Sequence, residues 1–207
     1  MARASRAVAD QHRTAIEEAS ARLFRQHGLH GVTVAQVMAS AGLTHGGFYN
    51  HFASKDELVA IGCARAFSDA AVRWEQKITQ HGDDRHAARR QLMEHYLSEA
   101  HRDAPENGCP ASALAGDVAR EPAGKPVRQA YLDGIGQLLT AWKPLALPED
   151  DDADAGTTHR TALVELATLV GAILLARATA GDAISDDILA AARVWLLETE
   201  SHAVPAA

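Results

Sequence analysis

Apolar residues recur along this chain at spacings of three, four and seven positions, which is the period of a helix that buries one face. No run of β-branched residues alternates over six positions, so nothing in the pattern favours strands. We therefore predict an all-α fold of about nine helices. The expected helices cover residues 10–27, 33–42, 44–51, 54–78, a segment through Leu97 that ends before Pro105, 111–120, 127–142, 158–180 and a last segment through Leu196.

Several residues mark where the first helices begin and end. Gly28 is placed to end the first helix in a left-handed conformation, and Gly42 to end the second. The segment 33–36 begins with Thr and ends with Gln, and the segment 54–57 begins with Ser and ends with Glu. Both fit a capping box, in which the hydroxyl and the fourth side chain each satisfy a free backbone N–H.

Residues 33–52 have the layout of a helix-turn-helix, with two short helices around a glycine turn at residues 41–43. Six apolar residues are spaced to form the small core between these helices: Val34, Val37, Met38, Leu43, Phe48 and Phe52. The remaining residues of the second helix point outward, where their polar side chains can reach phosphates or base edges in a DNA major groove. They are Thr44, His45, Gly47, Tyr49, Asn50 and His51.

This stretch resembles the DNA-binding domain of the TetR/AcrR family, over about residues 10–60. The residues that carry the resemblance are Thr44, Gly46, Phe48, Tyr49, Phe52, Lys55 and Leu58. The resemblance implies an N-terminal three-helix DNA-binding domain, residues 1–55, and a C-terminal helical domain, residues 56–207, that binds a small-molecule inducer and dimerises. It also implies a homodimer that reads two half-sites of a palindromic operator.

The family pattern, carried over residue by residue, assigns two kinds of DNA contact. It implies phosphate contacts for Thr33, Thr44, Tyr49, His51 and Lys55, and base-facing positions for His45, Gly47 and Asn50. The positions at helix N-termini suit phosphates, because free N–H groups and the positive end of the helix dipole lie there. Two alternatives stay open: Gly47 is merely tolerated on a surface turn, and Tyr49 packs in the core.

Charge is distributed unevenly along the chain. The net charge is -7 overall. Residues 1–55 hold six Lys/Arg against three Asp/Glu, a net of +3, which leaves 14 bases against 24 acids, a net of -10, for residues 56–207. Such asymmetry favours an N-terminal end that faces nucleic acid.

Other features of the sequence narrow the function class. There is no secretory signal pattern, and the apolar stretch 161–178 contains Glu165 and Arg177, which favours a buried helix over a membrane span. No phosphate loop, nucleophile elbow or metal-ligand spacing is present, and the histidines are expected on polar surfaces. We therefore expect a cytoplasmic protein that is not an enzyme and uses no cofactor or metal.

An inducer site is expected among apolar residues of the central helices. The candidate ligand contacts are Met93, Tyr96, Cys109, Leu114, Tyr131, Ile135, Trp142 and Leu166. The alternative is that they form a filled core, in which case the protein is a ligand-independent DNA-binding or scaffolding dimer. Cys109 has two interpretations of its own: a thiol sensor activated at a helix N-terminus before Pro110, or a small buried residue.

The last two helices are the expected dimer interface. The segment 158–180 is too apolar for exposure on any face, and its small residues permit close helix approach. The final helix carries a single apolar stripe through Trp195. Together they predict an isologous twofold interface.

Overall fold

The structure is a computed structural model that describes residues 2–146 and 155–202, with side chains over 6–146 and 155–198. All regular elements in these ranges are helices, which confirms the all-α prediction. Residues 148–154 contain five acidic residues, which predicts a solvated loop, and this segment lies outside the described residues.

The described residues form two compact units, which interleave along the chain. Unit 1 comprises Met1–Asp69 and Pro105–Ile135, and unit 2 comprises Ala70–Ala104 and Gly136–Ala207. The division differs from the predicted boundary after residue 55, which separates the chain by function and stays a prediction.

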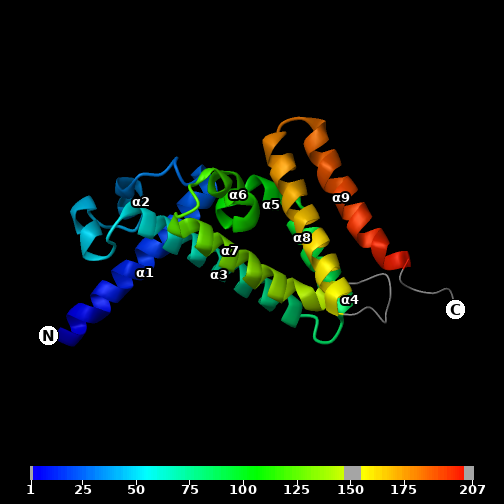
Figure 1. Cartoon of the computed structure of the whole chain (residues 1–207), viewed down its shortest axis with the longest axis horizontal. Helices are drawn as coiled ribbons and strands as arrows, with labels where there is room; N and C mark the ends of the chain where they lie inside the picture. The colour runs from blue at the N-terminus through cyan, green and yellow to red at the C-terminus, as the bar shows by residue number, and fades with distance from the viewer. Residues whose placement is uncertain (1, 147–154, 203–207) are drawn as a thin grey trace. The chain divides into compact units, whose positions relative to one another are not determined.

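Unit 1 contains the N-terminal helices and the helices that pack on them (Figure 1). Its elements are α1 (Ala2–His27), α2 (Val34–Ser40), the 3-10 helix η1 (His45–Asn50), the first part of α3 (Lys55–Thr79), the 3-10 helix η2 (Pro105–Asn107), α6 (Pro110–Arg120) and most of α7 (Pro126–Trp142). Large apolar side chains fill its core, among them Ile16, Phe24, Leu29, Met38, Phe48, Leu58, Phe67 and Leu114.

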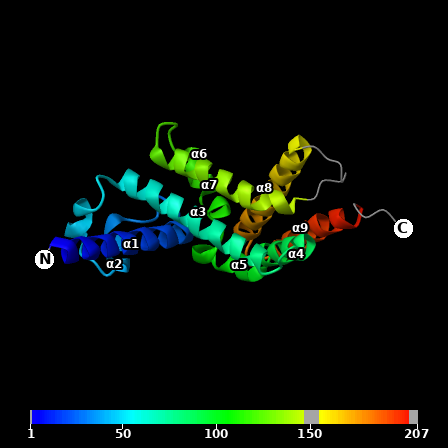
Figure 2. The ribbon, with the colours of Figure 1, turned by 90° about the horizontal axis from the view of Figure 1, so that it is seen from below.

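Within unit 1, α7 lies alongside α3 (Figures 1 and 2), and Gly134 of α7 faces the ring of Phe67 of α3. A Cβ on Gly134 would lie 2.2 Å from Cγ of Phe67. Only a glycine therefore permits this approach of the two helices.

Unit 2 contains the end of α3, α4 (Arg85–Tyr96), α5 (Glu99–Asp103), the 3-10 helix η3 (Lys143–Leu145), α8 (Ala155–Ala178) and α9 (Ala183–His202). α8 and α9 lie side by side (Figure 1). A buried ion pair crosses this unit: Arg89 of α4 donates to Oε1 of Glu165 of α8 at 2.5 Å. The indole N–H of Trp142 donates to the other oxygen of Glu165 at 2.8 Å.

Helix boundaries agree with the predicted caps at most positions. Gly28 has φ +76° and Gly42 φ +74°, and the Thr33–Gln36 capping box is complete. At the second box the Ser54 hydroxyl accepts from the N–H of Glu57, but the Glu57 carboxylate accepts from the N–H of Ala53.

Three predicted elements are corrected by the structure. α1 begins at Ala2 and not near residue 10, because residues 2–9 are rich in alanine, the strongest helix former. The helix expected to run to the break before Pro105 is two helices, since Ser98 caps a new helix by accepting from the N–H of His101. The helix after Thr44 is a 3-10 helix without a side-chain cap, as suits a segment with two consecutive glycines.

Candidate nucleic-acid interface

The predicted helix-turn-helix is present at residues 33–52. α2 is followed by the left-handed Gly42, and the N–H of Leu43 returns to the carbonyl of Met38 at 2.9 Å. This turn closes the end of α2 and directs the chain into η1. The two short elements thereby take the arrangement of a DNA-reading motif.

A small apolar core fixes η1 against α2. Phe48 is buried and stacks on Phe52 with ring centroids 5.7 Å apart. Val37 and Met38 are also buried. Val34 and Leu43 are only partly buried, so four of the six predicted core residues are core in full.

The residues predicted to contact DNA lie largely on the outside of this motif. Thr33, Thr44, His45, Tyr49, Asn50 and Lys55 are exposed, while Gly47 and His51 are partly exposed. Tyr49 is 75% exposed, so the alternative in which it packs in the core does not hold in unit 1. Its ring makes an edge-on contact with the ring of Phe48, at 5.1 Å between centroids, and this contact holds the Tyr49 ring in place.

Sequence reasoning missed the part that Arg13 of α1 plays in holding η1. Its guanidinium donates to the carbonyl of His51 at 2.7 Å and lies over the ring of Phe52, 4.8 Å from the centroid. It also pairs with Glu17 at 3.0 Å. The only sequence signal was this i,i+4 pair of opposite charges, which is common on helix surfaces. Arg13 therefore positions the end of η1 beside the middle of α1.

A second set of contacts, also missed, joins the end of α1 to α6. Asp117 of α6 accepts a hydrogen bond from the N–H of Leu29 at 2.7 Å. The Arg25 guanidinium donates to the carbonyl of Glu106 at 2.8 Å. These partners are more than 80 positions apart in sequence, so no local pattern could have indicated them.

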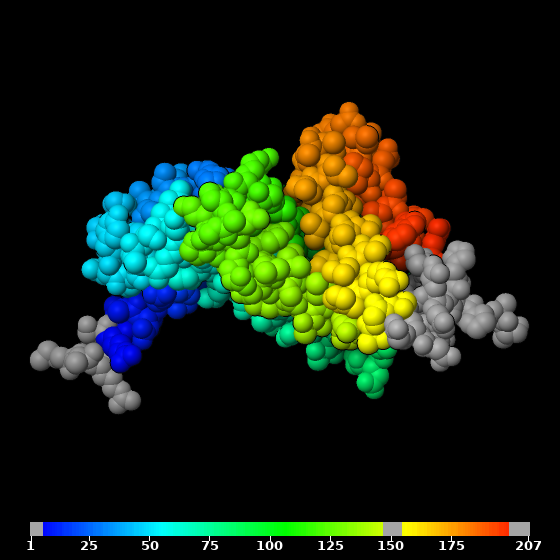
Figure 3. All heavy atoms as spheres, viewed as in Figure 1, coloured from blue at the N-terminus to red at the C-terminus, as the bar shows by residue number. Residues whose placement is uncertain are grey.

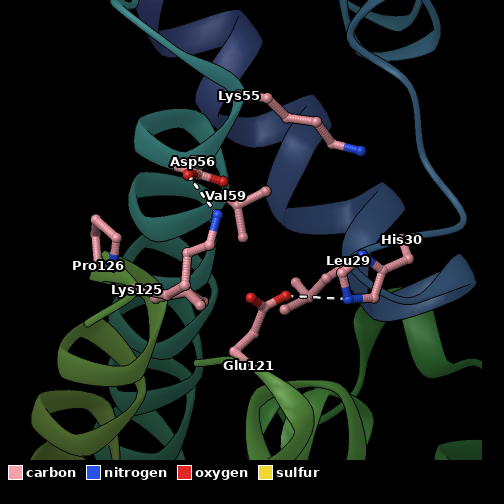
Figure 4. A pocket seen from close by; sticks show the side chains of 9 residues that line it. Leu29, His30, Lys55, Asp56, Val59, Glu121, Lys125 and Pro126 are labelled. Atoms are coloured by element: carbon pink, nitrogen blue, oxygen red, sulfur yellow. Dashed lines mark hydrogen bonds and ion pairs between the residues drawn. The ribbon is translucent and has the colours of Figure 1, made fainter. Parts of the chain in front are cut away.

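A charged cavity of about 230 Å³ lies beside these contacts (Figure 4). On one wall His30 faces Glu121, with Nε2 and Oε1 3.0 Å apart. On the other Lys125 pairs with Asp56 at 2.7 Å. The cavity is thus lined by the loop after α1, the first turn of α3 and the turn between α6 and α7. Lys55, predicted to contact phosphate, extends from the same rim with its amine turned away from the Lys125–Asp56 pair.

The predicted ligand contacts divide between the two units. Cys109, Leu114, Tyr131 and Ile135 belong to unit 1, and Met93, Tyr96, Trp142 and Leu166 to unit 2. All are buried except Tyr131 and Ile135, which are partly exposed. Those two line a groove of about 680 Å³ between α6 and α7. A single cavity shared by all eight residues stays a prediction.

The environment of the two cysteines differs from that of a typical reactive thiol. Cys109 is the N-cap of α6, as predicted, and is 4% exposed. Burial raises the pKa of the Cys63 thiol to about 12. Burial also raises the pKa of Tyr131, with smaller contributions from the adjacent Cys109 and Cys63. The Tyr131 hydroxyl remains a hydrogen-bond donor, and it binds the carbonyl of Ala111 at 2.7 Å.

The histidines were expected on polar surfaces, but His101 is buried. His101 is 9% exposed and its Nδ1 lies 2.6 Å from the carbonyl of Tyr96. Burial lowers the pKa of His101 to about 4, so the ring is neutral at physiological pH. Across the described ranges 2–146 and 155–202, no group of three or more His, Cys, Asp or Glu is arranged to hold a metal ion.

α8 is long and apolar enough to cross a membrane by length and composition alone. Two of its three charged residues have partners within unit 2, however. Glu165 binds Arg89 and Trp142, and Arg177 donates to the carbonyls of His101 and Arg102. Its apolar composition therefore also fits a helix packed among others.

Comparison with known proteins connects this geometry to a family. Residues 16–60 match the family model described as bacterial regulatory proteins, tetR family. No curated protein matches the sequence significantly.

Solved structures of similar fold include a TetR transcriptional regulator from Chloroflexus aurantiacus, at 21% identity and a TM-score of 0.72, which covers 93% of this chain and 96% of that one. A TetR-family regulator from Cytophaga hutchinsonii has 21% identity and a TM-score of 0.72, with 92% and 94% covered. The reduced form of NemR from E. coli has 17% identity and a TM-score of 0.70, with 87% and 94% covered. The sequence of residues 16–60 thus matches the tetR family of bacterial regulatory proteins, and the described helices have the fold of solved TetR-family regulators.

Proposed function

We propose that this protein is a cytoplasmic homodimeric repressor that binds a palindromic operator and leaves it when a small-molecule inducer binds. The observation that carries the proposal is the polar, exposed face of the helix-turn-helix. Thr44, His45, Tyr49 and Asn50 of this face are exposed, although the motif beneath it is packed on Phe48 and Phe52. An exposed polar face on a packed motif is suited to binding DNA, since its side chains can reach phosphates and base edges.

On this proposal Thr33, Thr44, Tyr49, His51 and Lys55 contact phosphates, whereas His45, Gly47 and Asn50 face bases. The Tyr49→Phe and Lys55→Ala variants should both weaken binding to all duplexes. Lys55→Ala should also reduce the salt dependence, because each phosphate that a cation neutralises contributes about 0.9 to the slope of log K against log salt. His45→Ala should instead change the preferred sequence. Binding-site selection from a random duplex library, followed by anisotropy titrations, measures both effects.

Two outcomes would contradict this assignment. If His45→Ala selected the same sequence as wild type and merely bound it less tightly, the base-facing position would be wrong. If Tyr49→Phe kept the wild-type affinity for all duplexes, its hydroxyl would not contact phosphate. Lys143→Ala is the charge control, since Lys143 is exposed on η3 in unit 2.

We propose that α8 and α9 form the dimer interface. Large apolar side chains on these helices are exposed in the single chain: Leu163, Val164, Leu174, Leu175, Ile184, Val194 and Trp195. Exposed apolar patches of this kind mark protein interfaces. Light scattering at micromolar concentration should give the dimer mass for wild type and a lower mass for Leu175→Glu. A stable wild-type monomer would exclude the proposed interface.

An inducer would bind among the predicted ligand contacts, of which Tyr131 and Ile135 line the groove between α6 and α7. A thermal-shift screen of small hydrophobic compounds tests this, since a ligand at 100 times its Kd stabilises a protein by about 2.7 kcal/mol. Hits should then release the protein from the selected duplex. Compounds that stabilise the protein without releasing DNA would favour a ligand-independent DNA-binding or scaffolding dimer.

A second candidate is a thiol sensor acting through Cys109, at the N-terminus of α6. The position of Cys109 as N-cap supports the thiol-sensor interpretation, because the helix dipole stabilises a thiolate there. The burial of Cys109 argues against this interpretation. Peroxide or an alkylating agent should abolish DNA binding of wild type and of Cys63→Ser but spare Cys109→Ser. Equal loss in all three proteins would leave Cys109 as a packing residue.

A further inference from the structure

Three contacts of Arg13 meet at the end of η1. Its Nη1 donates to the carbonyl of His51, the C-cap of η1, at 2.7 Å. Its Nε donates to Oε1 of Glu17, one turn farther along α1, at 3.0 Å. The carbon at the centre of the guanidinium lies over the ring of Phe52, 4.8 Å from the centroid. One side chain of α1 therefore holds both residues that follow η1.

These contacts extend through packed rings to the outer face of η1. The ring of Phe52 stacks on that of Phe48, with centroids 5.7 Å apart. Phe48 makes the edge-on contact with Tyr49 at 5.1 Å. Phe48 and Phe52 are buried, whereas Tyr49 is exposed. Because closely packed groups do not shift independently, a change at Arg13 is transmitted to the exposed side of the motif.

η1 needs this support because it has little stability of its own. It is a six-residue 3-10 helix that contains Gly46 and Gly47, and its N-cap Thr44 makes no side-chain hydrogen bond to it. Short 3-10 helices have poor hydrogen-bond geometry, and glycine is the weakest helix former after proline. Figure 3 shows the segment around η1, in cyan, at the surface of the face in view. Contacts on the inner side of η1 therefore set its orientation.

From these contacts and the weak internal stability of η1 we infer that Arg13 is a positioning residue for sequence reading, which holds η1 in the orientation at which His45 and Asn50 meet base edges. The inference rests on the proposed function, because it assumes that η1 reads an operator. A hydrogen bond to a base edge depends steeply on distance and angle, whereas the attraction between a cation and a phosphate changes slowly with distance. Loss of the Arg13 contacts therefore reduces discrimination between sequences more than it reduces binding to DNA in general.

The geometry of an arginine is needed at this position, and not only its charge. The guanidinium is a planar fork that can lie with its face on a ring while its edge donates to two acceptors. The ammonium group of a lysine is a compact charge and does not combine these contacts. Since the Arg13 side chain is 41% exposed, the alternative is that Arg13 contacts a phosphate directly. Arg13→Lys keeps the charge and loses the fork, whereas Arg13→Gln loses both, so the two variants separate positioning from a direct contact.

The test compares full-length wild type with Arg13→Lys, Arg13→Gln and Glu17→Gln. Anisotropy titrations from 50 to 200 mM KCl use a duplex that wild type selects from a random library and a scrambled duplex of equal length. Both Arg13 variants should bind the selected duplex about tenfold more weakly, which is comparable to the loss of one base contact. Their binding to the scrambled duplex and their salt slope should stay close to wild type, because no neutralised phosphate is lost.

Arg65→Lys is the matched control. Arg65 also joins α3 to α1, since it pairs with Glu18 at 2.9 Å and with Asp69 at 2.8 Å, and these partners lie on α1 and α3. This variant should keep the wild-type preference for the selected duplex. Circular dichroism and the Tm of each variant show whether it is folded during the titrations. If the Arg13 variants do not fold, Glu17→Gln carries the test, because it removes only the carboxylate that orients Arg13 and should still reduce the preference.

The outcomes distinguish this inference from the proposed function. If wild type selects no duplex, the proposed function fails. If wild type selects a duplex and the folded Arg13 and Glu17 variants keep its preference, the inference is overturned while the proposed function stands. If Arg13→Lys matches wild type but Arg13→Gln weakens binding to both duplexes and lowers the slope by about 0.9 per protomer, Arg13 contacts phosphate directly and the inference is overturned. An equal loss of preference in Arg65→Lys would also overturn it, since the effect would then reflect destabilisation of unit 1.

Discussion

The carboxylate of Asp117 accepts a hydrogen bond from the backbone N–H of Leu29 at 2.7 Å, and so joins α6 to the turn that follows α1. Gly28, one residue earlier, has φ +76°, and a Cβ there would lie 2.6 Å from the same carboxylate. The glycine and the aspartate therefore form one unit. Asp117 can reach the N–H of Leu29 only because residue 28 has no side chain.

This relationship predicts different costs for two alanine substitutions at left-handed glycines. Gly42→Ala should cost about 1 kcal/mol, because Gly42 has φ +74° but open space around its Cα. Gly28→Ala should cost more than that, since it adds the collision with Asp117. Urea unfolding measures both. Equal costs would mean that Asp117 moves away freely, and Gly28→Ala/Asp117→Ala should then show no coupling in a double-mutant cycle.

The contact between α7 and α3 predicts an opposite pair of effects on one helix. Gly134→Ala should destabilise the protein by about 3 kcal/mol or more, because its Cβ would overlap the buried ring of Phe67. Gly136→Ala, two positions later and in open space, should stabilise it by about 0.5–1 kcal/mol through helix propensity. Thermal unfolding of both variants checks this. A neutral Gly134→Ala would show that the two helices can separate at little cost.

The buried ion pair of unit 2 predicts a large loss when only one partner is removed. Glu165→Gln should cost about 3–5 kcal/mol, because it leaves the charge of Arg89, which is 1% exposed, without a carboxylate. The control is Asp69→Asn, which breaks the partly exposed pair with Arg65 and should cost at most about 1 kcal/mol.

Removal of both buried charges should cost less than removal of one. Arg89→Met/Glu165→Leu should be closer to wild type than Glu165→Gln, since it removes both buried charges. Chemical denaturation compares the three. If Glu165→Gln were no worse than Asp69→Asn, the pair would contribute no more than a surface one.

The buried His101 predicts a pH dependence of stability with a defined sign. Its pKa is about 4 in the folded protein, below the ordinary value of 6.5, chiefly through burial. Between these values the unfolded chain binds more protons than the folded one, so the free energy of unfolding falls as pH decreases from about 6.5 to 4. The contribution of His101 is at most about 3 kcal/mol and is fully present above pH 6.5.

His101→Gln removes this contribution, so the stability of wild type relative to the variant should decline on acidification through that window. Urea unfolding at pH 4.5, 5.5 and 7 gives the difference. Because the charge of His95 helps to lower the pKa of His101, the same comparison is also made in a His95→Gln background. A difference independent of pH would mean that His101 protonates as easily in the folded state as in the unfolded one.

Local sequence determined most of the secondary structure and the DNA-reading motif. The capping box at Thr33 and the left-handed Gly28 and Gly42 are set by residues within four positions of each other, where backbone sterics and side-chain hydrogen bonds act. The same holds for the core position of Phe48, which follows from helical period. The split of the segment before Pro105 at Ser98 was also a local signal, but it was outweighed by the continuous apolar pattern.

Only the tertiary structure decided what these elements meet. The bonds Asp117–Leu29, Arg25–Glu106 and Arg89–Glu165 join residues 76 to 88 positions apart. From sequence alone, charged and polar residues of a helix are predicted to be exposed, because their burial depends on partners from other helices. For this reason the sequence did not indicate that Arg89 and His101 are buried. The exposure of residues 6–11 of α1 was likewise decided by tertiary packing, because helix propensity favours a helix there but only the positions of the other helices determine whether it is covered.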